Sequence, residues 1–280
     1  MAERFEIKNP SDDTIVGNVH IPEKPIQTPI PVVVQCHGFK SFKDWGFHPF
    51  LSERLNEAGF AAIRFNFSHN GVEGDSQDFD RLDLFEKNTF SKEMEDLEAV
   101  LDTIPNLPGG DRLDSSWVAV IAHSRGAAAG VLVGSKHPNV KTLVTWAGIS
   151  TVHRYSNEIM EAWKKEGKIE IPNLRTGQQM PMDVSILEDL EQFRDKYDIL
   201  NACSDLKIPL LVVHGDEDET VPFMEGSLLH DHSPRGLRKL QIVPGGTHTF
   251  GAEHPFAGTT EDLDEAIRVT LDWLKLRLKD

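Results

Sequence analysis

Cysteine is scarce in this sequence. Only Cys36 and Cys203 occur in 280 residues, so at most one disulfide is possible, and one bridge cannot serve as the scaffold of a chain this long. Cys36 lies inside an apolar run, where a free and buried thiol is expected. These observations exclude a small disulfide-rich fold.

Positively charged residues are also relatively few. Lysine and arginine number 29 against 45 aspartates and glutamates, which gives a formal net charge of -16. Such a surface repels phosphate backbones and anionic lipids, so we expect neither nucleic acid nor a membrane surface as a partner. Acidic blocks such as residues 93–96 (EMED) are expected to form solvated helix faces.

Long hydrophobic runs are absent. No apolar stretch approaches the roughly 20 residues needed to span a bilayer. The first ten residues, MAERFEIKNP, lack the basic start and apolar core of a signal peptide, so we expect a cytoplasmic protein. The composition, 39% hydrophobic and 26% charged, is typical of a globular domain.

Short apolar runs alternate with amphipathic stretches along the chain. The central runs are apolar at successive positions, which is typical of parallel strands covered on both faces, whereas the first two alternate and predict an antiparallel edge. The alternation favours an α/β fold with a mostly parallel sheet of about eight strands between helices. The predicted strands cover residues 4–9, 14–21, 31–36, 61–67, 117–122, 142–146, 209–214 and 239–243.

One region interrupts this rhythm. About 55 residues separate the strand at 142–146 from the next buried strand, whereas a usual connection has roughly 2–6 residues. We predict an inserted cap over residues 151–205, between two parts of one core at 1–150 and 206–280. The cap contains two helical stretches, at 156–167 and 184–200, on either side of a turn-rich segment.

The stretch WVAVIAHSRGAAAG, residues 117–130, carries a serine between a strand and a helix. The small residues 126–130 allow the helix to pack close to the sheet after a sharp turn. The unpaired N–H groups at the start of the helix favour developing negative charge near Ser124. The stretch resembles the Gly-x-Ser-x-Gly nucleophile motif of the α/β-hydrolase superfamily, with Ala122 in place of the first glycine.

Two further stretches match patterns of the same superfamily. In HGDEDETVP, residues 214–222, the resemblance assigns the catalytic acid to Asp218, with Asp216 as the alternative that shapes the loop. In GGTHTF, residues 245–250, it assigns the catalytic histidine to His248, with His254 as the competitor. Ser124, Asp218 and His248 follow each other in the chain order expected of this fold.

A fourth stretch, QCHGF at residues 35–39, matches the oxyanion loop of the family. The resemblance implies an oxyanion hole formed by the backbone N–H groups of Phe39 and Arg125, which are fixed before charge develops. His37 is expected to hold the loop. The Arg125 side chain either attracts an anionic acyl group or makes a surface contact, and His69 and Asn70 either border the site or support their own loop.

Within this superfamily, the chain resembles intracellular carboxylesterases of the cinnamoyl and feruloyl esterase group and serine aminopeptidase-like hydrolases. This resemblance implies hydrolysis of a small-molecule ester through an acyl-enzyme, without a metal or organic cofactor. Substrate selection is expected in the cap, where apolar residues line an acyl pocket or simply pack the cap. These residues are Met160, Trp163, Met180, Met182 and Phe193.

Three alternatives remain open. An aminopeptidase needs cap carboxylates for the substrate ammonium group, and Glu188, Asp189 and Glu191 are the candidates, unless they form a solvated helix face. A thioesterase would use the same triad but would need a basic patch for a phosphorylated leaving group. A binding protein on the same fold would keep the residues without turnover. The composition decides neither for nor against a homodimer.

Overall fold

The computed structural model describes residues 2–278, which form an eight-stranded sheet in the order β1-β2-β4-β3-β5-β6-β9-β10. All eight predicted strands are present, with small shifts at their ends. Their bounds are β1 Ala2–Lys8, β2 Thr14–His20, β3 Ile30–Cys36, β4 Ala61–Phe65, β5 Leu113–His123, β6 Val140–Trp146, β9 Leu210–Gly215 and β10 Arg238–Val243.

The directions of the strands follow the hydrophobic patterns. Strand β2 pairs antiparallel with both β1 and β4, which confirms the predicted antiparallel edge. The remaining neighbours pair in parallel. Every residue of β3, β4 and β9 is buried, because helices cover both faces of this part of the sheet.

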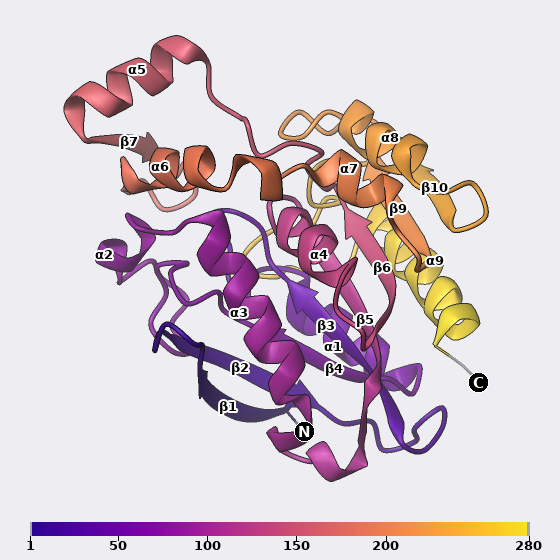
Figure 1. Cartoon of the computed structure of the whole chain (residues 1–280). Helices are drawn as coiled ribbons and strands as arrows, with labels where there is room; N and C mark the ends of the chain where they lie inside the picture. Colours follow the sequence, from indigo (N-terminus) through magenta and orange to yellow (C-terminus); the bar gives the residue numbers. More distant parts are fainter. Residues whose placement is uncertain (1, 279–280) are drawn as a thin grey trace.

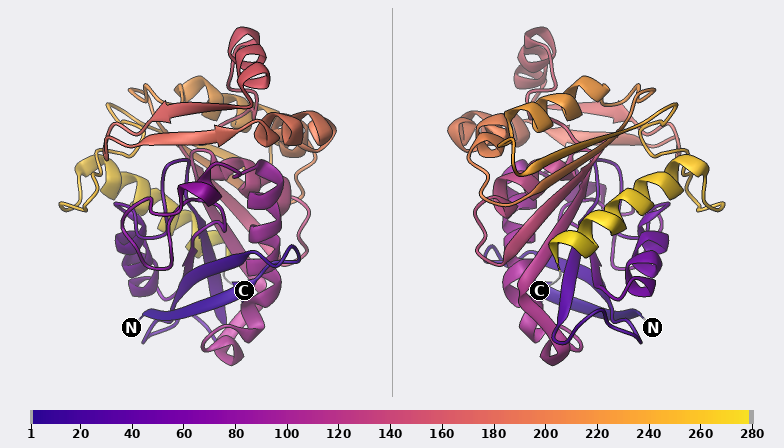
Figure 2. Two further views of the ribbon diagram at one scale, coloured as in Figure 1. Left: turned by 90° about the vertical axis from the view of Figure 1, so that its left-hand side faces the viewer. Right: turned by 90° about the vertical axis from the view of Figure 1, so that its right-hand side faces the viewer.

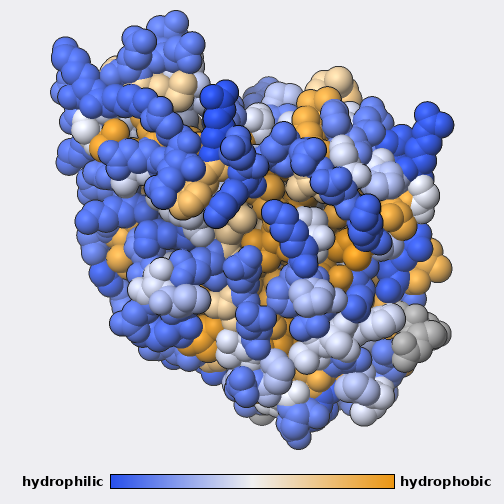
Figure 3. Space-filling model, viewed as in Figure 1, coloured by the Kyte–Doolittle hydropathy of each residue, from blue (hydrophilic) through white to orange (hydrophobic). Residues whose placement is uncertain are grey.

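The helices form a layer on each face of the sheet (Figure 2). One face carries α1 and α9, and the other carries α3, α4 and α8. The outer side of α3 is polar, whereas every residue of α4 is buried and α8 exposes Phe223, Met224 and Leu228. The face shown in Figure 3 is accordingly hydrophilic with hydrophobic areas between the polar ones. The bounds are α1 His48–Glu57, α2 Leu82–Phe85, α3 Phe90–Thr103, α4 Gly126–Gly134, α8 Phe223–His232 and α9 Glu261–Arg277, with 3₁₀ turns at Ile104–Asn106 and Gly110–Arg112.

The segment between β6 and β9 lies over one end of the sheet (Figure 1). The part expected to be a turn-rich segment is instead a hairpin, in which alternate residues such as Met180 and Met182 are buried. The helix expected over 184–200 is broken near Phe193, and α7 packs against α4 and α8. The elements are α5 Asn157–Glu166, β7 Lys168–Pro172, β8 Gln179–Asp183, α6 Ser185–Gln192, a 3₁₀ turn at Arg194–Lys196, and α7 Ile199–Ser204.

Cys36 is free and buried, as expected, and Cys203 is free and buried as well. Among residues 2–278, no helix combines the length and the apolarity that crossing a membrane requires.

The contact between α4 and β3 depends on glycine. A Cβ atom on Gly126 would lie 2.5 Å from the carbonyl oxygen of His37 and 3.0 Å from that of Cys36. Both atoms belong to backbone and cannot rotate away. The first turn of α4 therefore lies directly against the end of β3 and the loop that follows it.

We predict that Gly126→Ala lowers the free energy of unfolding by about 1–3 kcal/mol, because the added methyl group must push α4 away from β3. Urea denaturation followed by circular dichroism measures the change. Gly236→Ala is the control, since a Cβ there meets no atom within 4 Å. Equal stability of the two variants would contradict this close packing.

Candidate active site

Ser124 sits in a strained turn between β5 and α4. Its φ angle is 55°, in the left-handed region that residues with a side chain seldom adopt. The turn is held by the Ser124 N–H, which donates to the carbonyl oxygen of Trp146 at 2.9 Å. Gly38 approaches so closely that a Cβ on it would lie 2.9 Å from the Cβ of Ser124. The loop that follows β3 is therefore packed directly against Ser124.

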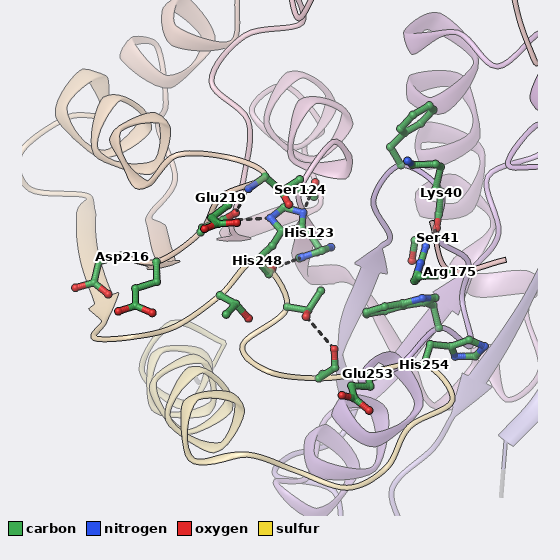
Figure 4. Close-up of a pocket in the computed structure, with 18 residues that line it drawn as sticks. Lys40, Ser41, His123, Ser124, Arg175, Asp216, Glu219, His248, Glu253 and His254 are labelled. Atoms are coloured by element: carbon green, nitrogen blue, oxygen red, sulfur yellow. Dashed lines mark hydrogen bonds and ion pairs between the residues drawn. The ribbon is translucent and has the colours of Figure 1, made fainter. Parts of the chain in front are cut away.

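Three side chains from three different strand ends form a continuous hydrogen-bonded chain (Figure 4). Ser124 Oγ lies 2.9 Å from His248 Nε2, and His248 Nδ1 lies 2.8 Å from Asp218 Oδ2. The three residues follow β5, β10 and β9. They are the residues to which the resemblance assigned the roles of nucleophile, acid and base.

The environment of Asp218 keeps its carboxylate ionised. Burial by itself would raise the pKa of Asp218, but hydrogen bonds from His214 and His248 and the charge of His248 hold the pKa well below its usual range. The second carboxylate oxygen accepts the backbone N–H groups of Thr220 and Val221, both at 2.9 Å. An ionised carboxylate in this position makes His248 carry its proton on Nδ1, so Nε2 faces Ser124 as an acceptor.

His123 supports the loop that carries His248. Its Nε2 donates to the carbonyl oxygen of His248 at 3.0 Å. Burial, and then the nearby His248, lower the pKa of His123 to about 3, so the ring stays neutral. This role could not be predicted from the sequence, because the contact joins residues 125 positions apart.

His37 braces the loop after β3, as expected. Its Nδ1 donates to the carbonyl oxygen of Gly38 at 2.9 Å, and its Nε2 accepts the N–H of Phe67 at 3.2 Å. Within residues 2–278, the backbone N–H groups of Phe39 and Arg125 donate to no protein acceptor. Both amides therefore remain available to a ligand oxygen.

The Arg125 side chain is buried against α3 and the loop after β3. Its Nε donates to Glu93 Oε1 at 2.8 Å, and its guanidinium carbon lies 3.9 Å from the centre of the Phe90 ring and 5.3 Å from that of Phe39. Burial raises the pKa of Glu93, while Arg125 and Asn88 act in the opposite direction. Arg125 therefore already has an anionic partner within the protein.

This pairing corrects the expectation for residues 93–96. Glu93 is 3% exposed and Asp96 is 0% exposed, so neither belongs to a solvated helix face. Asp96 accepts the N–H of Ser68 at 2.7 Å and the Asn9 side chain at 2.8 Å. The signal was present in the sequence, since both residues lie on the face of α3 that also carries Phe90, Leu97 and Val100.

A cavity of about 1180 Å³ opens over Ser124. It is lined by the three residues of the hydrogen-bonded chain and by Phe39, together with residues of the loops after β3, β9 and β10 and Arg175 from the cap hairpin. Lys40 and Arg175 also line the cavity, although neither was a candidate from the sequence. Charged residues in turns form no sequence pattern that would indicate a position in a cavity.

The apolar cap residues that were candidates for an acyl pocket do not line this cavity. Trp163, Met180 and Met182 are completely buried in the hydrophobic core, and Met160 and Phe193 are partly buried against it. The hairpin accounts for the difference, because it turns the alternate residues Met180 and Met182 inward. This is a correction: these five residues pack the cap.

Three other residues that the sequence offered as candidates for the site are hydrogen-bonded to loops around it. Asp216 accepts the N–H of Gly245 at 2.6 Å, and His254 accepts that of Gly46 at 3.1 Å while stacking on Trp45. Asn70 supports the His37 loop.

The other candidates from the sequence, His69 and the cap carboxylates, do not line the cavity over Ser124. His69 is hydrogen-bonded to Ser68 and does not line the cavity. Among the cap carboxylates, Asp189 accepts the Tyr197 hydroxyl at 2.7 Å, and neither it nor Glu188 or Glu191 lines the cavity. Within residues 2–278, no three His, Cys, Asp or Glu side chains are arranged as a metal site.

No family model and no curated protein matches the sequence, but solved structures match the fold over its whole length. Est1E of Butyrivibrio proteoclasticus with bound ferulic acid has 18% identity and a TM-score of 0.72, with 98% of each chain covered. The α/β hydrolase GrgF of Penicillium sp. sh18 has 15% identity and a TM-score of 0.70, with 99% of each chain covered. An esterase domain of a Rhodothermus marinus protein has 16% identity and a TM-score of 0.67, with both chains fully covered. The predicted α/β-hydrolase fold is thereby confirmed.

We predict that Glu93→Gln lowers the free energy of unfolding by about 3–5 kcal/mol, because it leaves the buried Arg125 guanidinium without a counter-charge. Glu98→Gln, on the exposed side of the same helix, is the control and should change stability by less than about 0.5 kcal/mol. Thermal and urea unfolding measure both. Similar effects of the two substitutions would show that the ion pair adds nothing to stability.

Proposed function

We propose that this protein is a serine hydrolase that cleaves carboxylic esters through an acyl-enzyme. The observation that carries the proposal is the hydrogen-bonded chain from Ser124 Oγ through His248 to Asp218, with both links between 2.8 and 2.9 Å. This arrangement gives a serine hydroxyl a base within proton-transfer distance and gives that base an anionic partner. The three residues also line a cavity large enough for a small molecule.

In the first half of the reaction, Ser124 Oγ attacks the ester carbonyl carbon while its proton passes to His248 Nε2. Asp218 stabilises the imidazolium that forms and does not itself take the proton. The carbonyl oxygen becomes an oxyanion, and the N–H groups of Phe39 and Arg125 are the donors we assign to it. When the tetrahedral intermediate collapses, the alcohol leaves with the proton from His248, and the acyl group remains on Ser124.

In the second half, water takes the place of the alcohol. His248 removes a proton from the water as its oxygen attacks the acyl carbon, and the same two N–H groups receive the second oxyanion. Collapse releases the carboxylic acid and returns the proton to Ser124. The net reaction consumes one ester and one water and produces one acid and one alcohol.

Two observations favour an ester over a peptide. Structures of similar fold include Est1E with ferulic acid and an esterase domain. The carboxylates that an aminopeptidase site was expected to use do not line the cavity, and Asp189 is occupied by Tyr197 and Ser91. We therefore propose a small-molecule ester as the substrate.

We expect the wild type to hydrolyse p-nitrophenyl esters, with the profile from acetate to longer acyl chains reporting the size of the acyl site. Ser124→Ala should abolish turnover because it removes the nucleophile. Asp218→Asn should lower kcat by about 10⁴, because His248 would then present the wrong tautomer to Ser124. The rate of p-nitrophenolate release measures turnover by the wild type and by both variants.

Asp216→Asn is the matched control, since Asp216 belongs to the same loop but contacts Gly245 instead of His248. It should lose less than about tenfold in kcat, whereas an equal loss in both variants would contradict the assignment of the acid. A fluorophosphonate should also react with Ser124 of the wild type, and mass spectrometry identifies the labelled residue. Hydrolysis of an aminoacyl p-nitroanilide alone would favour a peptidase, and no turnover by folded protein would favour a binding protein.

A further inference from the structure

Two cationic side chains meet on one wall of the cavity. Lys40 directly follows Phe39 in the oxyanion loop, and Arg175 lies in the turn between β7 and β8. The Arg175 guanidinium donates to the Lys40 carbonyl oxygen, and the Lys40 ammonium donates to the carbonyl oxygen of Pro172 at 3.1 Å. The cap hairpin and the oxyanion loop are thus fastened together at this point.

Neither cation forms a salt bridge with the part of the chain that the structure describes. Within residues 2–278, no carboxylate oxygen lies within 4.0 Å of the Lys40 ammonium or the Arg175 guanidinium. This is unexpected in a chain with a net charge of -16. Burial, and then the nearby charge of Arg175, lower the pKa of Lys40. The two charges therefore repel each other at the edge of the site, which an anionic ligand would relieve.

The opposite wall has the opposite charge. Figure 4 shows Lys40 and Arg175 on one side of Ser124 and His248, and Asp216 and Glu219 on the other. Glu217, in the same loop, also lines the cavity. Glu253 also lines the cavity and lies on the side of Arg175 in Figure 4, so acidic residues are not confined to the second wall. An anionic group on a substrate is attracted to Lys40 and Arg175 and repelled by the carboxylates of the loop after β9, which favours one orientation over the reverse.

We propose that Lys40 and Arg175 form a subsite for a carboxylate on the substrate, so that the preferred esters are those that carry a free carboxylate besides the ester group. The proposal rests on the proposed ester hydrolysis and names its substrate class. Half-esters of dicarboxylic acids and hydroxybenzoic acids acylated at their phenolic oxygen are members of this class.

The geometry of Arg175 suits this role. Its guanidinium carbon lies 4.8 Å from the centre of the Trp45 ring, and Trp45 is itself buried. The aromatic contact and the hydrogen bond to the Lys40 carbonyl oxygen restrict the planar group while leaving further N–H donors for an oxygen ligand. A guanidinium restrained in this way binds a carboxylate through paired N–H donors, and the Lys40 ammonium adds a point charge beside it.

A different role would give a different result. If the two cations only fasten the hairpin to the oxyanion loop through backbone carbonyl groups, their removal should weaken turnover of neutral and anionic esters equally. If they bind a carboxylate, their removal should affect the anionic ester more. The informative quantity is therefore the ratio of kcat/KM between two esters that differ only in a carboxylate.

Two matched pairs of esters measure this ratio. In the first, the carboxylate is on the acyl side, with p-nitrophenyl hydrogen suberate compared with p-nitrophenyl methyl suberate. In the second it is on the alcohol side, with 4-acetoxybenzoate compared with methyl 4-acetoxybenzoate. In at least one pair, we expect the wild type to prefer the anionic member by about tenfold, mainly through KM, and the pair that responds identifies the side.

Arg175→Gln and Lys40→Gln should each bring the ratio towards one, and Arg175→Lys should retain part of it. Lys207→Gln is the control: it removes the same charge from an exposed position outside the cavity and should leave the ratio at its wild-type value. Raising NaCl to about 0.5 M should reduce the wild-type preference, because salt screens the attraction.

The two proposals fail in distinguishable ways. If the neutral esters are hydrolysed and neither pair shows a preference, the carboxylate subsite is wrong while ester hydrolysis stands. If no ester is hydrolysed, NMR titration of Ser124→Ala with monomethyl suberate and dimethyl suberate makes the same comparison without turnover. Equal binding of these two ligands would overturn the subsite, and tighter binding of the monoester that Arg175→Gln removes would support it.

Discussion

The left-handed turn at Ser124 is the constraint on which the rest of the site depends. A φ angle of 55° at a residue with a side chain is strained, and it persists because both sides of the turn are packed tightly. Gly38 lies against the serine, Gly126 lies against the end of β3, and the Trp146 carbonyl oxygen holds the Ser124 N–H. The strain places the hydroxyl above the strand ends, where His248 reaches it.

Buried polar groups hold the loops around this turn in place. Glu93 pairs with Arg125, His37 bonds to Gly38, and Asp96 accepts the N–H of Ser68 in the loop after β4. Each of these groups loses contact with water on folding, so its hydrogen bond is costly to break. The loop that carries Phe39 is thus held by the sheet and by the cap hairpin, and Arg125 is held by Glu93 of helix α3.

The electrostatic asymmetry of the cavity comes from the same loops. The loop after β3 and the cap hairpin contribute Lys40 and Arg175, while the loop after β9 contributes Asp216 and Glu219. Parallel strands bring the ends of β3 and β9 to one edge of the sheet, so charges far apart in sequence face each other across Ser124. The net charge of the chain gives no indication of this local separation.

The sequence by itself determined the order of the strands along the chain and the antiparallel edge, because both depend on local patterns of apolar residues. Its short motifs also identified the three residues of the hydrogen-bonded chain, through their resemblance to those of α/β-hydrolases. Only the tertiary structure decided that Met180 and Met182 pack the cap, that Glu93 is buried, and that Lys40 and Arg175 meet. The physical reason is that such contacts join segments distant in sequence, and burial and pairing depend on what lies opposite, which local periodicity does not specify.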